Sequence, residues 1–216
     1  MFILLKMIKR RVSPETWESG QRLKRKILAS LGHDDMQWVR KTQVDAWRSF
    51  LRGLPASGRD ALEISPGGQT IWRDIGFRSY TEVQFPDFDI TRDRLPRSFD
   101  VIIADQVFEH LRDPYRAVRN LRTMLKDEGV FLIATPFLIK IHAYPHDFTR
   151  WTSDGLREFL ADAGFDAEIH AWGNRKAVIA NLKRWVPYGW GRDLRNQPDF
   201  PVNIWAYARK RNSPAS

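Results

Sequence analysis

One short segment limits the possible folds more than any other. The run Ala61-Leu-Glu-Ile-Ser-Pro-Gly-Gly-Gln69 passes from an acidic, apolar strand pattern directly into a turn that contains glycine. Because glycine has no Cβ, such a turn lets the backbone pack closely against a helix or a nucleotide-like ligand. A tight strand-to-helix turn needs glycine with or without a ligand. The segment alone therefore indicates a strand–helix unit and no particular function.

Beyond residue 58, strand and helix patterns alternate along the chain. Apolar runs predict strands at about 60–65, 79–84, 99–105, 129–135, 167–172 and 203–210. Asp113-Pro114 and Thr152 are typical helix starts, with a capping side chain or a proline in the first turn. This alternation predicts an α/β fold, with a mostly parallel central sheet and helices on both faces. Residues 85–90 follow the second strand almost at once, which leaves little room for a helix and predicts an abbreviated sheet on that side.

The residues before this α/β region read as a helical cap. Ser13 and Pro14 mark one helix start, and a second helix is predicted over roughly 34–52, closed by Gly53. Leu54-Pro-Ala-Ser-Gly58 is the expected boundary. We therefore predict a cap over 1–55 and an α/β domain over 56–216, with an insertion near 175–202.

Charge is distributed unevenly along the 216 residues, whose net charge is +9. Residues 1–54 carry 12 basic and 5 acidic side chains, residues 55–170 carry 14 and 19, and residues 171–216 carry 9 and 2. Basic flanks favour anionic partners such as phosphates, nucleic acid or an anionic membrane surface. The same charge also serves simply to keep a protein soluble, so both interpretations stay open.

Composition excludes some chemistry. The chain has no cysteine, which excludes disulfides, thiolate metal ligands and thiol catalysis. Its apolar start lacks both a preceding basic region and a small-residue cleavage site, and it is too short to span a bilayer. A cytoplasmic location is therefore the expectation.

Three motifs occur in a fixed order. They are Glu63-Ile-Ser-Pro-Gly67, then Phe99-Asp-Val-Ile-Ile103 followed by Glu109-His110, then Gly129-Val-Phe-Leu-Ile-Ala-Thr-Pro136. In order and spacing, over roughly 58–172, they resemble class I S-adenosylmethionine-dependent methyltransferases. The resemblance implies a Rossmann-like fold, S-adenosyl-L-methionine as cofactor, and methyl transfer as the reaction.

The resemblance also assigns residues to the methionine half of the cofactor. Glu63 and the turn Ser65, Gly67 and Gly68 would embrace it, with Ser65 standing where the family usually has glycine. Asp105 and Gln106 would lie beside the transferring methyl group.

The resemblance assigns a second group of residues to the nucleoside half of the cofactor. Gln84 stands where an acidic residue normally binds the two ribose hydroxyls, so either Gln84 or nearby Asp87 would take that role. Asp89 matches an acidic position beside the adenine, and Ile90 would flank the ring. Asp89 is equally typical of a loop-capping residue.

A methyl transfer to an alcohol needs alignment and the removal of one proton. His146 is our first candidate for the base and His142 the second, while Asp105 and His110 are further catalytic candidates beside the methyl group. A Glu-His pair such as Glu109-His110 also serves to order a loop.

The segment Ile141-His-Ala-Tyr-Pro-His-Asp-Phe-Thr-Arg-Trp-Thr152 is the most unusual in the chain. Its His-Asp-x-x-Arg-Trp-Thr pattern resembles bacterial methyltransferases of glycan and cell-surface polysaccharide pathways. Contact with substrate is predicted for His142, Tyr144, Asp147, Arg150 and Trp151, with an Asp147–Arg150 ion pair as the alternative. No metal site is expected, because Pro145 prevents a regular helix between His142 and His146.

The leading hypothesis is an S-adenosylmethionine-dependent methyltransferase that acts on a small-molecule or glycan-like acceptor, including an anionic one, at oxygen. Residues 1–54 and 173–203 would form the walls that face the acceptor. RNA is an alternative acceptor, although Asp105-Gln-Val-Phe108 replaces the Asn-Pro-Pro-Tyr type of motif used on nucleobase nitrogen. A non-catalytic cofactor-binding protein or a peripheral membrane protein is the third hypothesis. The sequence predicts no oligomeric state.

Overall fold

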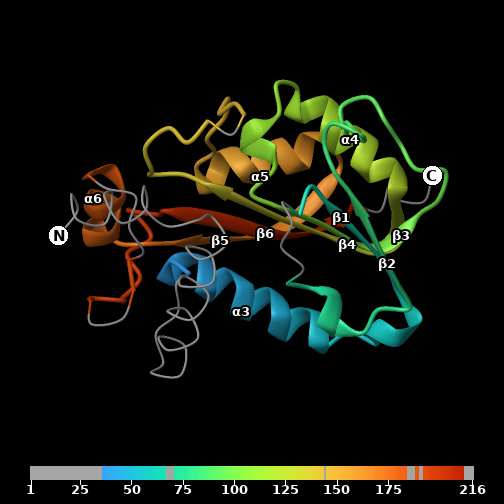
Figure 1. Cartoon of the computed structure of the whole chain (residues 1–216), viewed down its shortest axis with the longest axis horizontal. Helices are drawn as coiled ribbons and strands as arrows, with labels where there is room; N and C mark the ends of the chain where they lie inside the picture. The colour runs from blue at the N-terminus through green and yellow to red at the C-terminus, as the bar shows by residue number, and fades with distance from the viewer. Residues whose placement is uncertain (1–35, 67–70, 144, 184–187, 190–191, 212–216) are drawn as a thin grey trace, which may run out of the picture.

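The centre of the molecule is a six-stranded sheet (Figure 1). The computed structural model describes residues 36–66, 71–143, 145–183, 188–189 and 192–211. In spatial order the strands are β2 (Ser79–Val83), β1 (Asp60–Ile64), β3 (Phe99–Asp105), β4 (Leu125–Pro136), β6 (Asn203–Lys210) and β5 (Phe165–Trp172). Strands β2, β1, β3 and β4 pair in parallel, while β6 lies antiparallel between β4 and β5. The predicted α/β class and mostly parallel sheet are confirmed.

The sheet is short on the β2 side, as predicted. Strand β2 is the edge of the sheet, and the chain reaches it from β1 through the single 3-10 turn η2 (Arg73–Ile75) among its described residues. From β2 to β3 the described chain contains no helix. The connection from β2 to β3, residues 84–98, is therefore a loop.

Helices α4 (Pro114–Met124) and α5 (Ser153–Asp162) cover one face of the sheet (Figure 1). The Asp113 carboxylate accepts a hydrogen bond from the backbone N–H of Arg116, and the Thr152 hydroxyl accepts one from Gly155. These caps satisfy amide groups that have no partner within the helix, which confirms both predicted helix starts. Helix α4 ends at Met124, and Leu125 begins β4.

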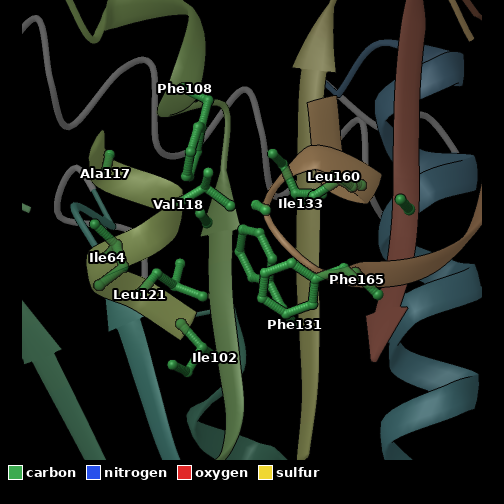
Figure 2. Close-up of a cluster of buried hydrophobic side chains, with 14 of the residues drawn as sticks. Ile64, Ile102, Phe108, Ala117, Val118, Leu121, Phe131, Ile133, Leu160 and Phe165 are labelled. Atoms are coloured by element: carbon green, nitrogen blue, oxygen red, sulfur yellow. The ribbon is translucent and has the colours of Figure 1, made fainter. Parts of the chain in front are cut away.

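Apolar side chains of α4 and α5 interlock with those of the strands, as Figure 2 shows. Phe131 of β4 lies 5.8 Å from Phe108 and 5.9 Å from Phe165, measured between ring centroids. All three rings are essentially inaccessible to solvent. This cluster holds the ends of β3 and β4 in place and so fixes the residues that follow those strands.

Helix α3 (Trp38–Arg52) covers the opposite face (Figure 1). Val44, Trp47 and Leu51 pack into a cluster with strand residues that include Val101 and Trp205. Helices on both faces are therefore confirmed, and the described part of the predicted cap shares a core with the sheet. The first predicted helix, near residue 13, lies outside the described residues, and the domain boundary at 55 stays a prediction.

The predicted insertion contains a further helix, α6 (Arg175–Lys183), which the sequence did not indicate. Ala177 and Val178 pack with Val39 of α3 and Val202 before β6. None of the helices in the described ranges is long and apolar enough to cross a membrane.

Candidate functional site

Two cavities lie side by side where the strands end. The first, of about 420 Å³, is bordered by residues at and after the ends of β1, β2 and β3, and by Pro145 and His146 of the loop after β4. The second, of about 380 Å³, is bordered by α3, by the segment after β4 and by the start of β6. Gln106 lines both cavities. In an open α/β sheet this edge is the general location of ligand sites.

Five of the predicted cofactor-binding residues line the first cavity: Ser65, Gln84, Asp89, Ile90 and Gln106. The predicted catalytic residues His110 and His146 also border it. Gly67 and Gly68 lie outside the described residues, so their predicted role stays a prediction.

Two backbone positions shape this first cavity. Ser65 and Gln106 have φ angles of 50° and 61°, in the left-handed region that non-glycine residues seldom adopt. The Ser65 N–H donates to the Val83 carbonyl at 2.7 Å, and the Gln106 N–H donates to the Ala134 carbonyl at 2.9 Å. Each hydrogen bond ties a sharp turn to the neighbouring strand, which accounts for the unusual conformations.

Asp89 orders its own loop. Its carboxylate accepts hydrogen bonds from the backbone and hydroxyl of Thr91, at 2.9 and 2.7 Å, and it pairs with Arg92 at 3.0 Å. Burial opposes ionisation, but these partners hold the pKa of Asp89 below its usual range. Ile90 follows with only 3% of its surface exposed. Asp89 therefore caps its own loop, as the alternative interpretation expected, and also lines the first cavity.

Glu63 is a buried acid at the end of β1. It accepts a hydrogen bond from the Tyr80 hydroxyl, and burial raises its pKa to about 7. The nearby charge of Asp105 acts in the same direction. Glu63 precedes the turn at Ser65 by two positions.

The second cavity contains polar side chains from three separate parts of the chain. Arg40 of α3 forms an ion pair with Asp105 and also donates to Gln43 at 2.7 Å. The Gln106 side chain donates to Asn203 of β6 at 2.9 Å. Gln37, Arg40 and Asn203 were not singled out by the sequence, because no local motif marks them. All three fall within the segments 1–54 and 173–203, whose role as acceptor-facing walls stays a prediction.

Glu109 lies between a histidine of each cavity, fully buried in the 3-10 turn η3 (Phe108–His110). Its Oε1 is 3.6 Å from His110 Nε2 and 3.8 Å from His142 Nε2. The two imidazole rings stand perpendicular, with centroids 5.0 Å apart. Burial raises the pKa of Glu109 to about 8. His110 lines the first cavity and His142 the second.

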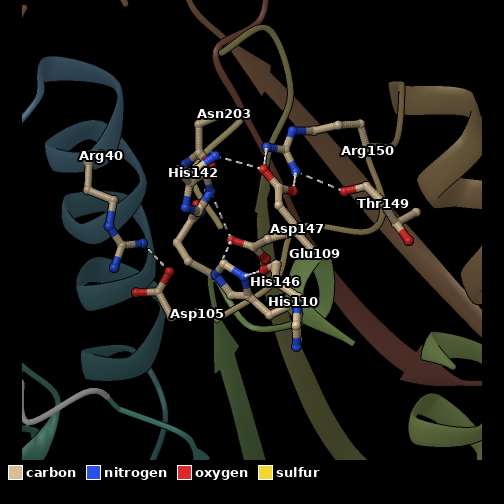
Figure 3. A network of polar contacts seen from close by, with 11 residues as sticks. Arg40, Asp105, Glu109, His110, His142, His146, Asp147, Thr149, Arg150 and Asn203 are labelled. Carbon is tan, nitrogen blue, oxygen red and sulfur yellow. Dashed lines mark hydrogen bonds and ion pairs between the residues drawn. The ribbon is translucent and has the colours of Figure 1, made fainter. Parts of the chain in front are cut away.

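The loop after β4 is braced by polar contacts (Figure 3). Asp147 pairs with Arg150 through both carboxylate oxygens and also accepts a hydrogen bond from the His142 N–H at 3.0 Å. Burial opposes the ionisation of Asp147, but these partners lower its pKa below the usual range. Burial, followed by the charge of His110, lowers the pKa of His142. The ion-pair alternative for Asp147 and Arg150 is therefore present in the structure.

Trp151 requires a correction. It was expected to contact substrate, but its side chain packs in the core against Phe159, with ring centroids 5.2 Å apart, and it lines neither cavity. Packing against Phe159 of α5 removes the large apolar surface of Trp151 from water, which favours this position. Tyr144 lies outside the described residues, so its predicted contact remains a prediction.

Comparison with known proteins gives the family. A model of the methyltransferase domain matches residues 35–168. A probable S-adenosylmethionine-dependent methyltransferase of Mycolicibacterium smegmatis is 27% identical over 161 residues, which is 62% of each chain. A malonyl-[acyl-carrier protein] O-methyltransferase of Halalkalibacterium halodurans is 32% identical over 92 residues, 41% of this chain and 34% of that protein. The chain therefore spans less than two thirds of either relative.

Solved structures show the same fold. The 1,6-didemethyltoxoflavin-N1-methyltransferase of Burkholderia thailandensis, with bound S-adenosylhomocysteine, superposes with a TM-score of 0.56 at 13% identity and covers 93% of this chain and 92% of that one. The glycopeptide N-methyltransferase MtfA, in complex with S-adenosyl-L-methionine, gives 0.52 at 15% identity and covers 78% and 93%. The domain match over residues 35–168 places the chain in the methyltransferase-domain family. The motifs of the sequence had indicated the S-adenosylmethionine-dependent class.

Proposed function

We propose that the protein binds S-adenosylmethionine in the first cavity and methylates a hydroxyl group of a small-molecule or glycan-like acceptor in the second. The observation that carries this proposal is the contact between the two cavities at Gln106, at the carboxyl edge of the sheet. A two-substrate transfer requires such adjoining sites, because the reacting atoms must meet in line.

The first cavity fits the chemical groups of the cofactor. Ile64, Ile90 and Leu111 give it an apolar wall for an aromatic base, while Gln84 and Asp89 offer acceptors for ribose hydroxyls. The left-handed turn at Ser65 turns the chain sharply at the end of β1, where a ligand is approached by backbone. When bound, S-adenosylmethionine supplies a methyl group that is already activated by its positively charged sulfur.

Acidic side chains favour a cation at this place. Glu63 and Asp105 end neighbouring strands, and each is buried or nearly so. Arg40 offsets the charge of Asp105 from the side of the second cavity. In this arrangement the chain would orient the donor.

The second cavity suits an acceptor with hydroxyl groups. Gln37, Arg40 and Asn203 present polar groups to it, and apolar contacts come from Val39, Pro136, Ile139 and Val202. His142 is the titratable group of this wall nearest to Glu109, and it is the residue that we assign to the acceptor proton. His146 borders the first cavity instead, so the order of our two candidate bases is reversed in the proposal.

The test is the formation of S-adenosylhomocysteine from S-adenosylmethionine with a panel of acceptors. The panel would contain nucleotide sugars, oligosaccharides and hydroxylated small molecules, with mixed RNA as a separate arm. We expect product with a hydroxylated acceptor, and the methyl group on oxygen by mass spectrometry. Product with RNA alone, or a methyl group on nitrogen, would overturn the proposed acceptor class.

A further inference from the structure

We propose that Glu109, His110 and His142 bind a divalent transition-metal ion of the zinc class where the two cavities meet. The site itself stands on geometry alone. Its role in activating an acceptor hydroxyl rests on the proposed function.

The first observation is the state of Glu109. Its side chain is completely buried, and apart from its own backbone N–H neither oxygen has a hydrogen-bond partner in the described part of the chain. A buried carboxylate without a partner is costly, and proteins normally pair such a group or place it on a metal. The side chain is directed instead toward two imidazole nitrogens (Figure 3).

The second observation fixes the tautomer of His110. Its Nδ1 forms a hydrogen bond with the backbone carbonyl of His146, and a carbonyl oxygen only accepts. Nδ1 therefore carries the proton, and in the neutral ring Nε2 presents a lone pair to Glu109. A histidine that ligates a metal usually donates its other N–H to a carbonyl or carboxylate in this way.

Distances between the three ligand atoms agree with a shared ion. They all lie within 4.8 Å of one another, and the two histidine–carboxylate separations are 3.6 and 3.8 Å. Around tetrahedral zinc, bonds of about 2.0–2.2 Å set ligand atoms roughly 3.3–3.6 Å apart. Small side-chain movements would therefore complete the coordination.

The loop after β4 positions the third ligand. The Asp147 carboxylate accepts a hydrogen bond from the backbone N–H of His142 at 3.0 Å and also pairs with Arg150. The backbone N–H of Phe148 donates to the Glu109 carbonyl at 2.7 Å. The loop is thereby bound to the same turn that carries Glu109 and His110. This bracing gives the Asp147–Arg150 pair a positioning role and explains why it need not touch substrate.

Two imidazoles and one carboxylate suit zinc and its neighbours better than magnesium, which prefers oxygen ligands. Three protein ligands leave a coordination position open, as in catalytic zinc sites. Since His110 lines one cavity and His142 the other, an acceptor hydroxyl would reach that position from the second cavity. The ion would lower the pKa of the hydroxyl, which would release its proton to water at neutral pH. With the ion bound, His142 would therefore act on the acceptor proton as a metal ligand and not as the base itself.

The test is a calorimetric titration of chelator-treated full-length protein with ZnCl₂, and separately with MgCl₂. We expect one zinc ion per chain and weaker or no binding of magnesium. Glu109→Gln and His142→Ala should each weaken zinc binding by more than the roughly 10- to 100-fold typical of losing an outer-shell partner. His170→Gln is the matched control, because His170 pairs with Glu168 at 2.9 Å on β5, away from the trio.

Circular dichroism and thermal unfolding of each variant would show that it is folded. Equal zinc affinity in the wild type and a folded Glu109→Gln or His142→Ala variant would overturn the site, as would equal affinity for magnesium. S-adenosylhomocysteine binding is measured on the same metal-free samples. A thermal shift there without zinc binding refutes the metal site alone, whereas zinc binding without that shift refutes the proposed function alone.

Discussion

The two cavities differ in what builds them. The first is enclosed mainly by the turns that follow β1, β2 and β3, each placed by a local strand pattern, with Pro145 and His146 added from the loop after β4. The second combines α3, the segment after β4 and the start of β6, which are far apart in the sequence. The first belongs to the part of the fold that carries the family motifs. The second forms only when distant parts of the chain meet in the fold, and it is the cavity whose residues we expect to determine acceptor specificity.

The largest expected effect is on cofactor binding and comes from Glu63, which directly precedes Ile64 and Ser65 of the first cavity. Under the proposed assignment, Glu63→Ala should weaken S-adenosylhomocysteine binding by about 10- to 100-fold, in line with the ~1.5–3 kcal/mol of a hydrogen bond to a charged group. Isothermal titration calorimetry measures it directly. Glu82→Ala is the control. Glu82 lies on β2 in register with Glu63 of β1, but its carboxylate pairs with Arg73. Equal losses in the two variants would remove Glu63 from the cofactor site.

A substitution in the second cavity should leave the affinity for the cofactor unchanged. Arg40→Met should lower the free energy of unfolding by about 1–3 kcal/mol, because it leaves the nearly buried Asp105 carboxylate without its ion-pair partner. Adding Asp105→Asn should recover part of that loss in urea unfolding. If Arg40→Met instead abolished S-adenosylhomocysteine binding, the two cavities would not act as separate sites.

The buried acid also makes stability depend on pH. Because the folded-state pKa of Glu63 is raised to about 7, the folded protein binds a proton that the unfolded chain releases near its ordinary pKa. The stabilising contribution is complete below the unfolded pKa and is lost as pH rises toward 7. Relative to Glu63→Gln, the wild type should lose up to about 1.4 kcal/mol per pH unit in this window. Parallel unfolding curves for both proteins from pH 5 to 7 would contradict the assigned burial effect.

The smallest effect concerns the turn at Ser65. Ser65→Gly should stabilise the protein by less than about 1 kcal/mol, because relief at a φ of 50° is partly offset by the entropy of glycine. Gly76→Ser tests the reverse change, since Gly76 has a φ of 83° with open space around it. Opposite signs in thermal unfolding are expected, and a destabilised Ser65→Gly would show that the serine side chain is needed.

Local patterns were sufficient to predict most of the fold. Apolar runs placed all six strands, and capping side chains at Asp113 and Thr152 placed two helices. The residues of the first cavity follow directly from these strands. Helix α6 was missed because its nine residues carry too short an apolar pattern.

The second cavity was harder to predict because it depends on long-range pairing. Asn203 meets Gln106 only because β6 inserts between β4 and β5, and Arg40 meets Asp105 only because α3 crosses the sheet. Sequence spacing drew attention to His142 and His146 as a pair. The folded loop instead brings His142 to Glu109 and His110, more than thirty positions earlier in the chain.

Thermal unfolding of the wild type with and without S-adenosylmethionine or S-adenosylhomocysteine tests directly whether the protein binds the methyl donor. At about 100 times its dissociation constant, a ligand that binds only the folded state adds roughly 2.7 kcal/mol of stability. We expect a clear rise in melting temperature with both compounds, reduced in Glu63→Ala and retained in Glu82→Ala. An unchanged melting temperature in folded wild-type protein would contradict the claim that the first cavity binds the methyl donor.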